Sequence, residues 1–178
     1  MPALAKCVIS LFAKTEHRAV IGTASSAAKC REIKKAGAQH AIDTSKKDVV
    51  KEVARITKGR GVDVVYDPVG KDTYEISLAC LKDRGLLVSF GGASGPVPDI
   101  NFNEPRYMGR AWFLTRGSLF NYAHSRADRL LSSKRVFSMI RSGKVKVIIN
   151  QRYPLKDAAK LHKDVEARKT TGISMLVP

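Results

Sequence analysis

The stretch from Val62 to Gly92, VDVVYDPVGKDTYEISLACLKDRGLLVSFGG, decides the fold because two apolar segments in it flank a polar one. VDVVYDPVG is rich in β-branched residues and is typical of a strand buried on both faces of a parallel sheet. KDTYEISLACLKDRG predicts a helix, and LLVSFGG predicts the next strand. A strand, a helix and a strand in this order predict a right-handed crossover between parallel strands.

The same alternation continues in both directions along the chain. Helices are expected over residues 3–15, 25–38, 46–61, 122–142 and 156–170, the second with a serine cap and a stop at Gly37. Strands are expected over residues 18–24, 40–44, 111–117, 145–155 and 173–178, and residues 93–110 are expected to form a loop. This order predicts one α/β domain over residues 1–178, with a Rossmann-like, doubly wound parallel sheet.

Composition and charge narrow the function classes. The chain has 178 residues, and its 44% hydrophobic content is too high for a disordered protein. No apolar run approaches 18 residues, so no membrane-spanning segment is predicted. The net charge of +16 favours anionic partners, either dinucleotide phosphates or nucleic acid. The lysines are spread through every segment, which favours solvated helix faces over a dedicated nucleic-acid surface.

The cysteines and histidines offer no metal site. Three widely spaced cysteines indicate a reducing compartment, and we expect the cytoplasm. The four histidines are scattered, and no Cys-x-x-Cys or His-x-x-x-His spacing occurs. No Ser/His/Asp triad or carboxylate pair stands out either, so the catalytic residues remain unassigned.

The first candidate site follows the strand at residues 18–24. Ser25, Ser26 and Lys29 lie at a strand-to-helix turn, where backbone N–H groups and the helix dipole favour anions. A dinucleotide fold that binds NAD places an acid here, and an acid would repel a 2′-phosphate. Its absence favours NADPH, while an ordinary serine cap beside an exposed lysine is the alternative.

Three further features could contribute to a site at the carboxyl ends of the strands. FGGASG, with Phe90 and Gly91, would let backbone approach a ligand closely, or it is a plain glycine-rich turn. Asp67 could be catalytic, although a strand-end aspartate more often caps the next turn or helix. Arg168 could pair with a phosphate, or lie on the surface.

Taken in order, several segments resemble the zinc-independent quinone oxidoreductases of the medium-chain dehydrogenase/reductase superfamily. The resemblance covers nearly the whole chain and rests on AGAQHAID, residues 61–95, FLTRGSL, SGKVKV and residues 153–178. It implies the C-terminal, NADPH-binding domain of such an enzyme. The implied reaction is direct hydride transfer from NADPH to a quinone or enone without a metal, and the implied assembly is a homodimer.

The resemblance also implies roles for individual residues. Lys29 matches a lysine that binds the adenosine 2′-phosphate, and Thr44 stands where a tyrosine often helps it. Phe90-Gly91 and Thr115-Arg116 match segments that line the nicotinamide end. Arg168 matches an arginine near the cofactor's phosphates.

Two departures from the family pattern accompany this resemblance. The family's glycine-rich loop falls on residues 2–6, PALAK, which contain no glycine. The first strand of the nucleotide fold would precede Met1, so we expect unpaired edges on its neighbours, and we expect the N-terminal GroES-like substrate domain to be absent. The alternative hypothesis is therefore an inactive remnant, or a binding module that uses its basic surface on nucleic acid.

Overall fold

The computed structural model describes residues 19–167 and 169–178. These residues form helices and strands that alternate along most of the chain, and every strand pair is parallel. The expected Rossmann-like α/β class is therefore confirmed. The described chain divides into two compact units, residues 19–46 with 131–167 and 169–178, and residues 47–130. The predicted helix over residues 3–15 and Arg168 lie outside the described residues.

The start of the first unit is a β-α-β segment. Strand β1 (Ile21–Ala24) leads into helix α2 (Ala27–Lys35) and then into β2 (His40–Asp43), which pairs with β1. The serine cap is confirmed at Ser26, and Gly37 follows the helix with a φ of 112°, a conformation that suits glycine. The small core of this segment contains Ala24, Ile33 and Ala38.

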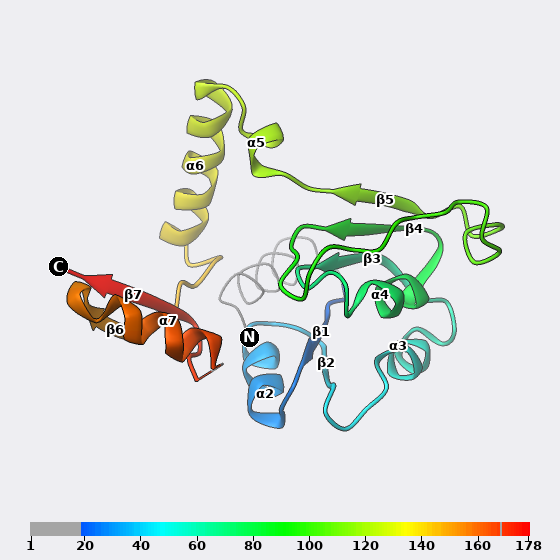
Figure 1. The fold of residues 1–178 in the computed structure, drawn as a ribbon, viewed down its shortest axis with the longest axis horizontal. Helices are drawn as coiled ribbons and strands as arrows, with labels where there is room; N and C mark the ends of the chain where they lie inside the picture. Colours follow the sequence, from blue (N-terminus) through cyan, green and yellow to red (C-terminus); the bar gives the residue numbers. More distant parts are fainter. Residues whose placement is uncertain (1–18, 168) are drawn as a thin grey trace. The chain divides into compact units, whose positions relative to one another are not determined.

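The second unit contains a three-stranded sheet in the order β3-β4-β5 (Figure 1). Its elements are α3 (Val49–Thr57), β3 (Val62–Asp67), α4 (Tyr74–Cys80), β4 (Leu81–Ser89) and β5 (Phe113–Arg116). Helix α4 packs on β3 and β4 (Figure 1). The buried core between them contains Tyr74, Leu78, Leu81 and Leu87.

Helix α4 is shorter than the sequence pattern predicts, because residues 81–85 belong to β4. Leu81 is buried and pairs with Val62 of β3. Its carbonyl oxygen accepts a hydrogen bond from the Arg110 guanidinium at 3.2 Å, and the Lys82 carbonyl accepts one from the Trp112 indole at 3.1 Å. These contacts tie the segment to residues about thirty positions away, and Arg84 has a φ of 58°, which is not a helical conformation. Tertiary contacts therefore override the local helix preference.

The prediction that β3 is buried on both faces is also wrong. Val65 packs against the core beneath α4, whereas Val64 and Tyr66 on the other face are 37% and 43% exposed. The cause is the sheet order, since β3 pairs only with β4 among the described residues. A strand at the edge of a sheet is covered less completely than a central strand.

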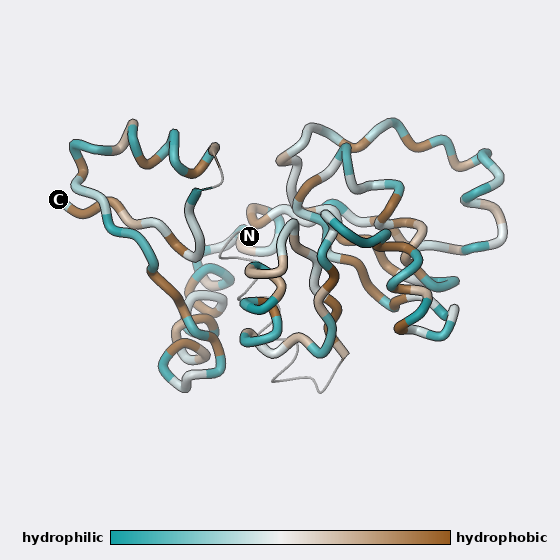
Figure 2. The backbone as a smooth tube through the Cα atoms, turned by 90° about the horizontal axis from the view of Figure 1, so that it is seen from below, coloured by the Kyte–Doolittle hydropathy of each residue, from teal (hydrophilic) through white to brown (hydrophobic). Residues whose placement is uncertain are grey.

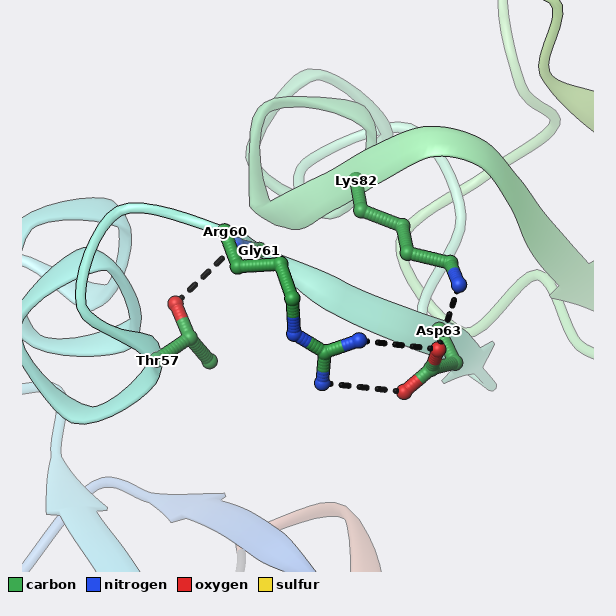
Figure 3. A network of polar contacts seen from close by, with 5 residues as sticks. All are labelled: Thr57, Arg60, Gly61, Asp63 and Lys82. Carbon is green, nitrogen blue, oxygen red and sulfur yellow. Dashed lines mark hydrogen bonds and ion pairs between the residues drawn. The ribbon is translucent and has the colours of Figure 1, made fainter.

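A polar cluster fixes the amino-terminal end of β3 (Figure 3). The Asp63 carboxylate accepts hydrogen bonds from both terminal guanidinium nitrogens of Arg60, at 3.2 and 3.3 Å (Figure 3). It also forms an ion pair with the Lys82 ammonium at 2.7 Å (Figure 3). The hydrogen bonds from Lys82 and Arg60 hold the pKa of Asp63 below its ordinary value. The Thr57 hydroxyl accepts from the Gly61 N–H at 3.0 Å. The ion pairs are largely exposed, so each adds at most about 1 kcal/mol.

Residues 93–110 form the expected loop, and the helix predicted over 122–142 is split in two. A short α5 (Leu119–Tyr122) precedes α6 (Arg126–Arg141). Ser125 and Asp128 cap α6 reciprocally, because each backbone N–H donates to the side chain of the other. Helix α6 has no buried residue, and Leu130 and Phe137 are 55% and 60% exposed.

The C-terminal segment is a second β-α-β arrangement. Strand β6 (Ile149–Pro154) leads through the turn η1 (Leu155–Asp157) into α7 (Ala158–Glu166), and β7 (Ile173–Val177) pairs with β6. Within the part of the chain that the structure describes, no helix has the length and apolar character needed to cross a membrane. The longer helices mix hydrophilic and hydrophobic residues along their length (Figure 2).

Two strands each have an edge without a strand partner among the described residues. Among residues 19–167 and 169–178, β1 pairs only with β2, and β3 pairs only with β4. Each of these strands therefore keeps one edge without a strand partner in the described chain, which is a template for further pairing.

Leu87→Ala tests the core of the second unit. Leu87 is 1% exposed between the sheet and α4, so its truncation leaves a cavity and should lower the free energy of unfolding by about 2–5 kcal/mol. Leu119→Ala is the matched control, because Leu119 is 75% exposed in the same unit and should change stability by less than about 0.5 kcal/mol. Urea unfolding measures both, and equal effects would contradict the assigned core.

Candidate functional site

The turn between β1 and α2 brings Ser25, Ser26 and Lys29 together in the first unit. The backbone of Ser26 is extended, and its hydroxyl oxygen accepts from the Lys29 N–H at 3.3 Å. Ser25 is exposed, Lys29 is partly buried, and the first turn of α2 carries no acid. The first N–H groups of a helix have no partner within it and carry partial positive charge. This turn can therefore bind an anion.

Thr44 lies beside the same turn, at the carboxyl end of β2. Its backbone N–H and its hydroxyl both donate to the carbonyl oxygen of Ala24, at 2.8 and 3.3 Å. The Ser45 hydroxyl donates to Asp43, and this bond keeps the pKa of the Asp43 carboxyl low. The resemblance named Thr44 as the residue that stands where a tyrosine of the family often helps to bind the 2′-phosphate. The parallel pairing of Ala24 with Asp43 is the signal that places it there.

The loops after β3 and β4 interlock in the second unit. The Val69 carbonyl oxygen accepts both the backbone N–H and the hydroxyl of Ser94, each at 2.9 Å. A Cβ on Gly91 would collide with the backbone of Pro68, and a Cβ on Gly70 would collide with the carbonyl oxygen of Gly95. The contact between the two loops thus requires glycine at position 91, and this requirement holds without any ligand.

Asp67 caps the turn that follows β3, which is the alternative that the sequence left open. The residue is 4% exposed, and its carboxylate accepts from the backbone N–H groups of Val69 and Gly70 at 2.8 and 3.2 Å. The Thr73 and Ser77 hydroxyls each donate to it at 2.8 Å. These four donors hold the carboxylate within the turn, which gives it a structural role.

Phe90, Gly91, Thr115 and Arg116 lie at the carboxyl ends of neighbouring strands. Thr115 and Arg116 of β5 pair with Val88 and Ser89 of β4, directly before Phe90. Thr115 and Arg116 are exposed, and Phe90 is partly buried. The structure thus groups these four predicted residues in the second unit and Ser25, Ser26 and Lys29 in the first.

Neither described cysteine is a ready nucleophile. Burial raises the pKa of the Cys80 thiol to about 11. Burial, and then the nearby Asp43 carboxylate, raise the pKa of Cys30. Both thiols therefore stay protonated near neutral pH, whereas nucleophilic attack requires the thiolate.

Parallel strands joined by helices, with polar loops at their carboxyl ends, define a Rossmann-like α/β protein. The zinc-binding dehydrogenase family matches residues 3–132, and the chain belongs to this family.

Several similar proteins are named as oxidoreductases or reductases. Quinone oxidoreductase of Salmonella typhimurium is 45% identical over 94% of this chain and 51% of its own length. The 2-haloacrylate reductase of Burkholderia sp is 38% identical over 89% of this chain and 48% of its own length. The structure of Escherichia coli quinone oxidoreductase complexed with NADPH has a TM-score of 0.90 and 40% identity, over 99% of this chain and 56% of that one. The chain spans about half the length of these relatives.

The family's zinc does not fit the described residues. Among residues 19–167 and 169–178, no group of three or more His, Cys, Asp or Glu side chains could hold a metal ion. Structural and catalytic zinc sites need three or four such ligands.

Gly91→Ala tests the interlocked loops. The added methyl group would meet the Pro68 backbone, so we expect a loss of about 1–3 kcal/mol in the free energy of unfolding. Gly92→Ala is the matched control, since a Cβ there makes only an ordinary contact of 3.4 Å with the Gly95 carbonyl oxygen. Chemical denaturation compares the two. Equal stability of both variants would contradict the loop contact.

Proposed function

We propose that this chain is the NADPH-binding portion of a quinone oxidoreductase-type enzyme. The observation that carries the proposal is the E. coli relative, which is complexed with NADPH and aligns with 99% of this chain. Bound NADPH would supply a hydride to a quinone or an enone. Because the chain spans about half of its relatives, the proposal assigns it the binding and orientation of the cofactor.

Lys29 and the start of α2 bind the adenosine 2′-phosphate in this proposal. The Ser26 hydroxyl already accepts the Lys29 N–H, so its own hydrogen is free to donate. The Lys29 ammonium supplies a full positive charge, and Ser25 adds an exposed hydroxyl. The acid-free first turn fits a phosphate dianion, because it leaves the positive end of the helix dipole uncompensated.

Phe90, Gly91, Thr115 and Arg116 line the nicotinamide end in this proposal. The Phe90 ring would cover the cofactor and exclude water, and Thr115 and Arg116 would offer hydrogen bonds from an exposed strand end. We assign Arg168 to the cofactor phosphates by resemblance alone.

A homodimer in the cytoplasm completes the proposal. Among the described strands, β5 pairs only with β4, and Phe113 on it is 60% exposed, which supports pairing with a second copy. The cytoplasm is supported by three widely spaced cysteines.

Lys29→Ala tests the cofactor assignment. Loss of a charge-assisted contact of about 1.5–3 kcal/mol should reduce the preference for NADPH over NADH by roughly tenfold or more. Isothermal titration of each cofactor into each protein gives the ratio of dissociation constants.

Lys35→Ala is the matched control. It removes the same charge from the same helix, at the end opposite the proposed phosphate site, and Lys35 pairs only with the exposed Glu32 in the described contacts. Its NADPH/NADH ratio should equal that of the wild type. An unchanged ratio in Lys29→Ala would refute the role of Lys29, and no binding of either cofactor to the wild type would refute the proposed function.

A further inference from the structure

We propose that Asp67 is a positioning residue for the loop of residues 90–95, and that it sets the affinity for the nicotinamide end of the cofactor without touching it. The inference rests on the proposed function, in which Phe90 and Gly91 line that end. It concerns the second unit alone, in which both Asp67 and the loop lie.

The first step is the buried carboxylate. Asp67 is 4% exposed, and its two oxygens accept the backbone N–H groups of Val69 and Gly70 and the hydroxyls of Thr73 and Ser77. A buried carboxylate with several donors is costly to displace, because each donor would lose its partner. The turn from Pro68 to Gly70 is therefore fixed relative to β3 and α4.

The second step is the contact between this turn and the 90–95 loop. The Asp67 carbonyl oxygen accepts the Phe90 N–H at 3.0 Å, and the Val69 carbonyl oxygen accepts the N–H and hydroxyl of Ser94. In return, the Gly95 carbonyl oxygen accepts the Lys71 N–H at 3.2 Å. Hydrogen bonds thus join the turn to both ends of the loop.

The third step is the close packing between the two segments. Neither Gly91 nor Gly70 has room for a Cβ, since Pro68 and Gly95 backbone atoms occupy that space. A loop in backbone contact cannot shift without moving the turn or breaking these bonds. The turn consequently determines where the Phe90-Gly91 segment lies, and the hydrogen bonds of Asp67 hold the turn in place.

The experiment compares two ligands on the full 178-residue chain. NADPH carries the nicotinamide, whereas adenosine 2′,5′-bisphosphate is the adenosine portion without it. Asp67→Ala should raise the dissociation constant of NADPH by about tenfold. The dissociation constant of the bisphosphate should change by no more than about twofold. Asp67→Asn keeps one carbonyl oxygen for the Val69 and Gly70 N–H groups, so it should restore most of the affinity.

Hydrogen exchange separates loop displacement from loss of the fold. In Asp67→Ala, the Ser94 amide should exchange faster while the amides of β4 keep their protection. If the β4 amides also lose protection, Asp67→Ala has disturbed the fold, and the affinities of Asp67→Asn and Ser94→Ala then test the proposal. Ser94→Ala removes the two hydrogen bonds of the Ser94 hydroxyl, with the Val69 carbonyl oxygen and the Asp72 N–H, at a partly buried site. It should cause the same selective loss to a smaller extent.

Asp72→Asn is the matched control, because Asp72 is an exposed carboxylate in the same turn region. It should change neither affinity. An equal loss of both ligands, or no loss of NADPH in any of the Asp67 and Ser94 variants, would overturn the role of Asp67. A wild-type chain that binds neither ligand would instead refute the proposed function, and the inference with it.

Discussion

The carboxylate of Asp67 is buried at the carboxyl end of β3, where it accepts hydrogen bonds from two backbone N–H groups and two hydroxyls. A charge removed from water is stabilised only when its lone pairs are satisfied, so the turn after β3 has little freedom. The same residue also accepts the Phe90 N–H through its carbonyl oxygen. Hydrogen bonds of this one residue, from its side chain and its backbone, thus reach the end of β3, the start of α4 and the loop after β4.

Two ways of capping a helix give two electrostatic results in this chain. Around α3 and α4 the positive helix ends are compensated, by Asp48 with Glu52 and by Glu75. Helix α2 has the neutral Ser26 as its cap and no acid in its first turn. A neutral cap satisfies an N–H group but leaves the dipole's positive end available. The presence or absence of an acid at the cap or in the first turn therefore distinguishes a compensated helix start from one that favours an anion.

The sequence predicted most of the fold because local chemistry determines most of it. β-branched runs, Ser26 and Gly37 gave correct elements around β1, α2 and β2. Residues 81–85 were predicted as helix because the contacts that hold them outside a helix come from Arg110 and Trp112, which are distant in sequence. The exposure of Val64 and Tyr66 depends on sheet order, which periodicity does not encode. For the site, the pattern identified the loops, but the contact of Gly91 with Pro68 needed coordinates.

The net charge of +16 and the position of Lys29 act on cofactor binding in different ways. A large positive charge attracts any anion over long range, and salt screens this attraction. NADPH and NADH both carry a pyrophosphate, so the overall field assists both and discriminates weakly between them. Discrimination requires a group that meets the 2′-phosphate alone, at short range and with directed hydrogen bonds. In the proposed site, the acid-free start of α2 with Lys29 would supply such a group, whereas the lysines dispersed over the other segments would add only to the overall field.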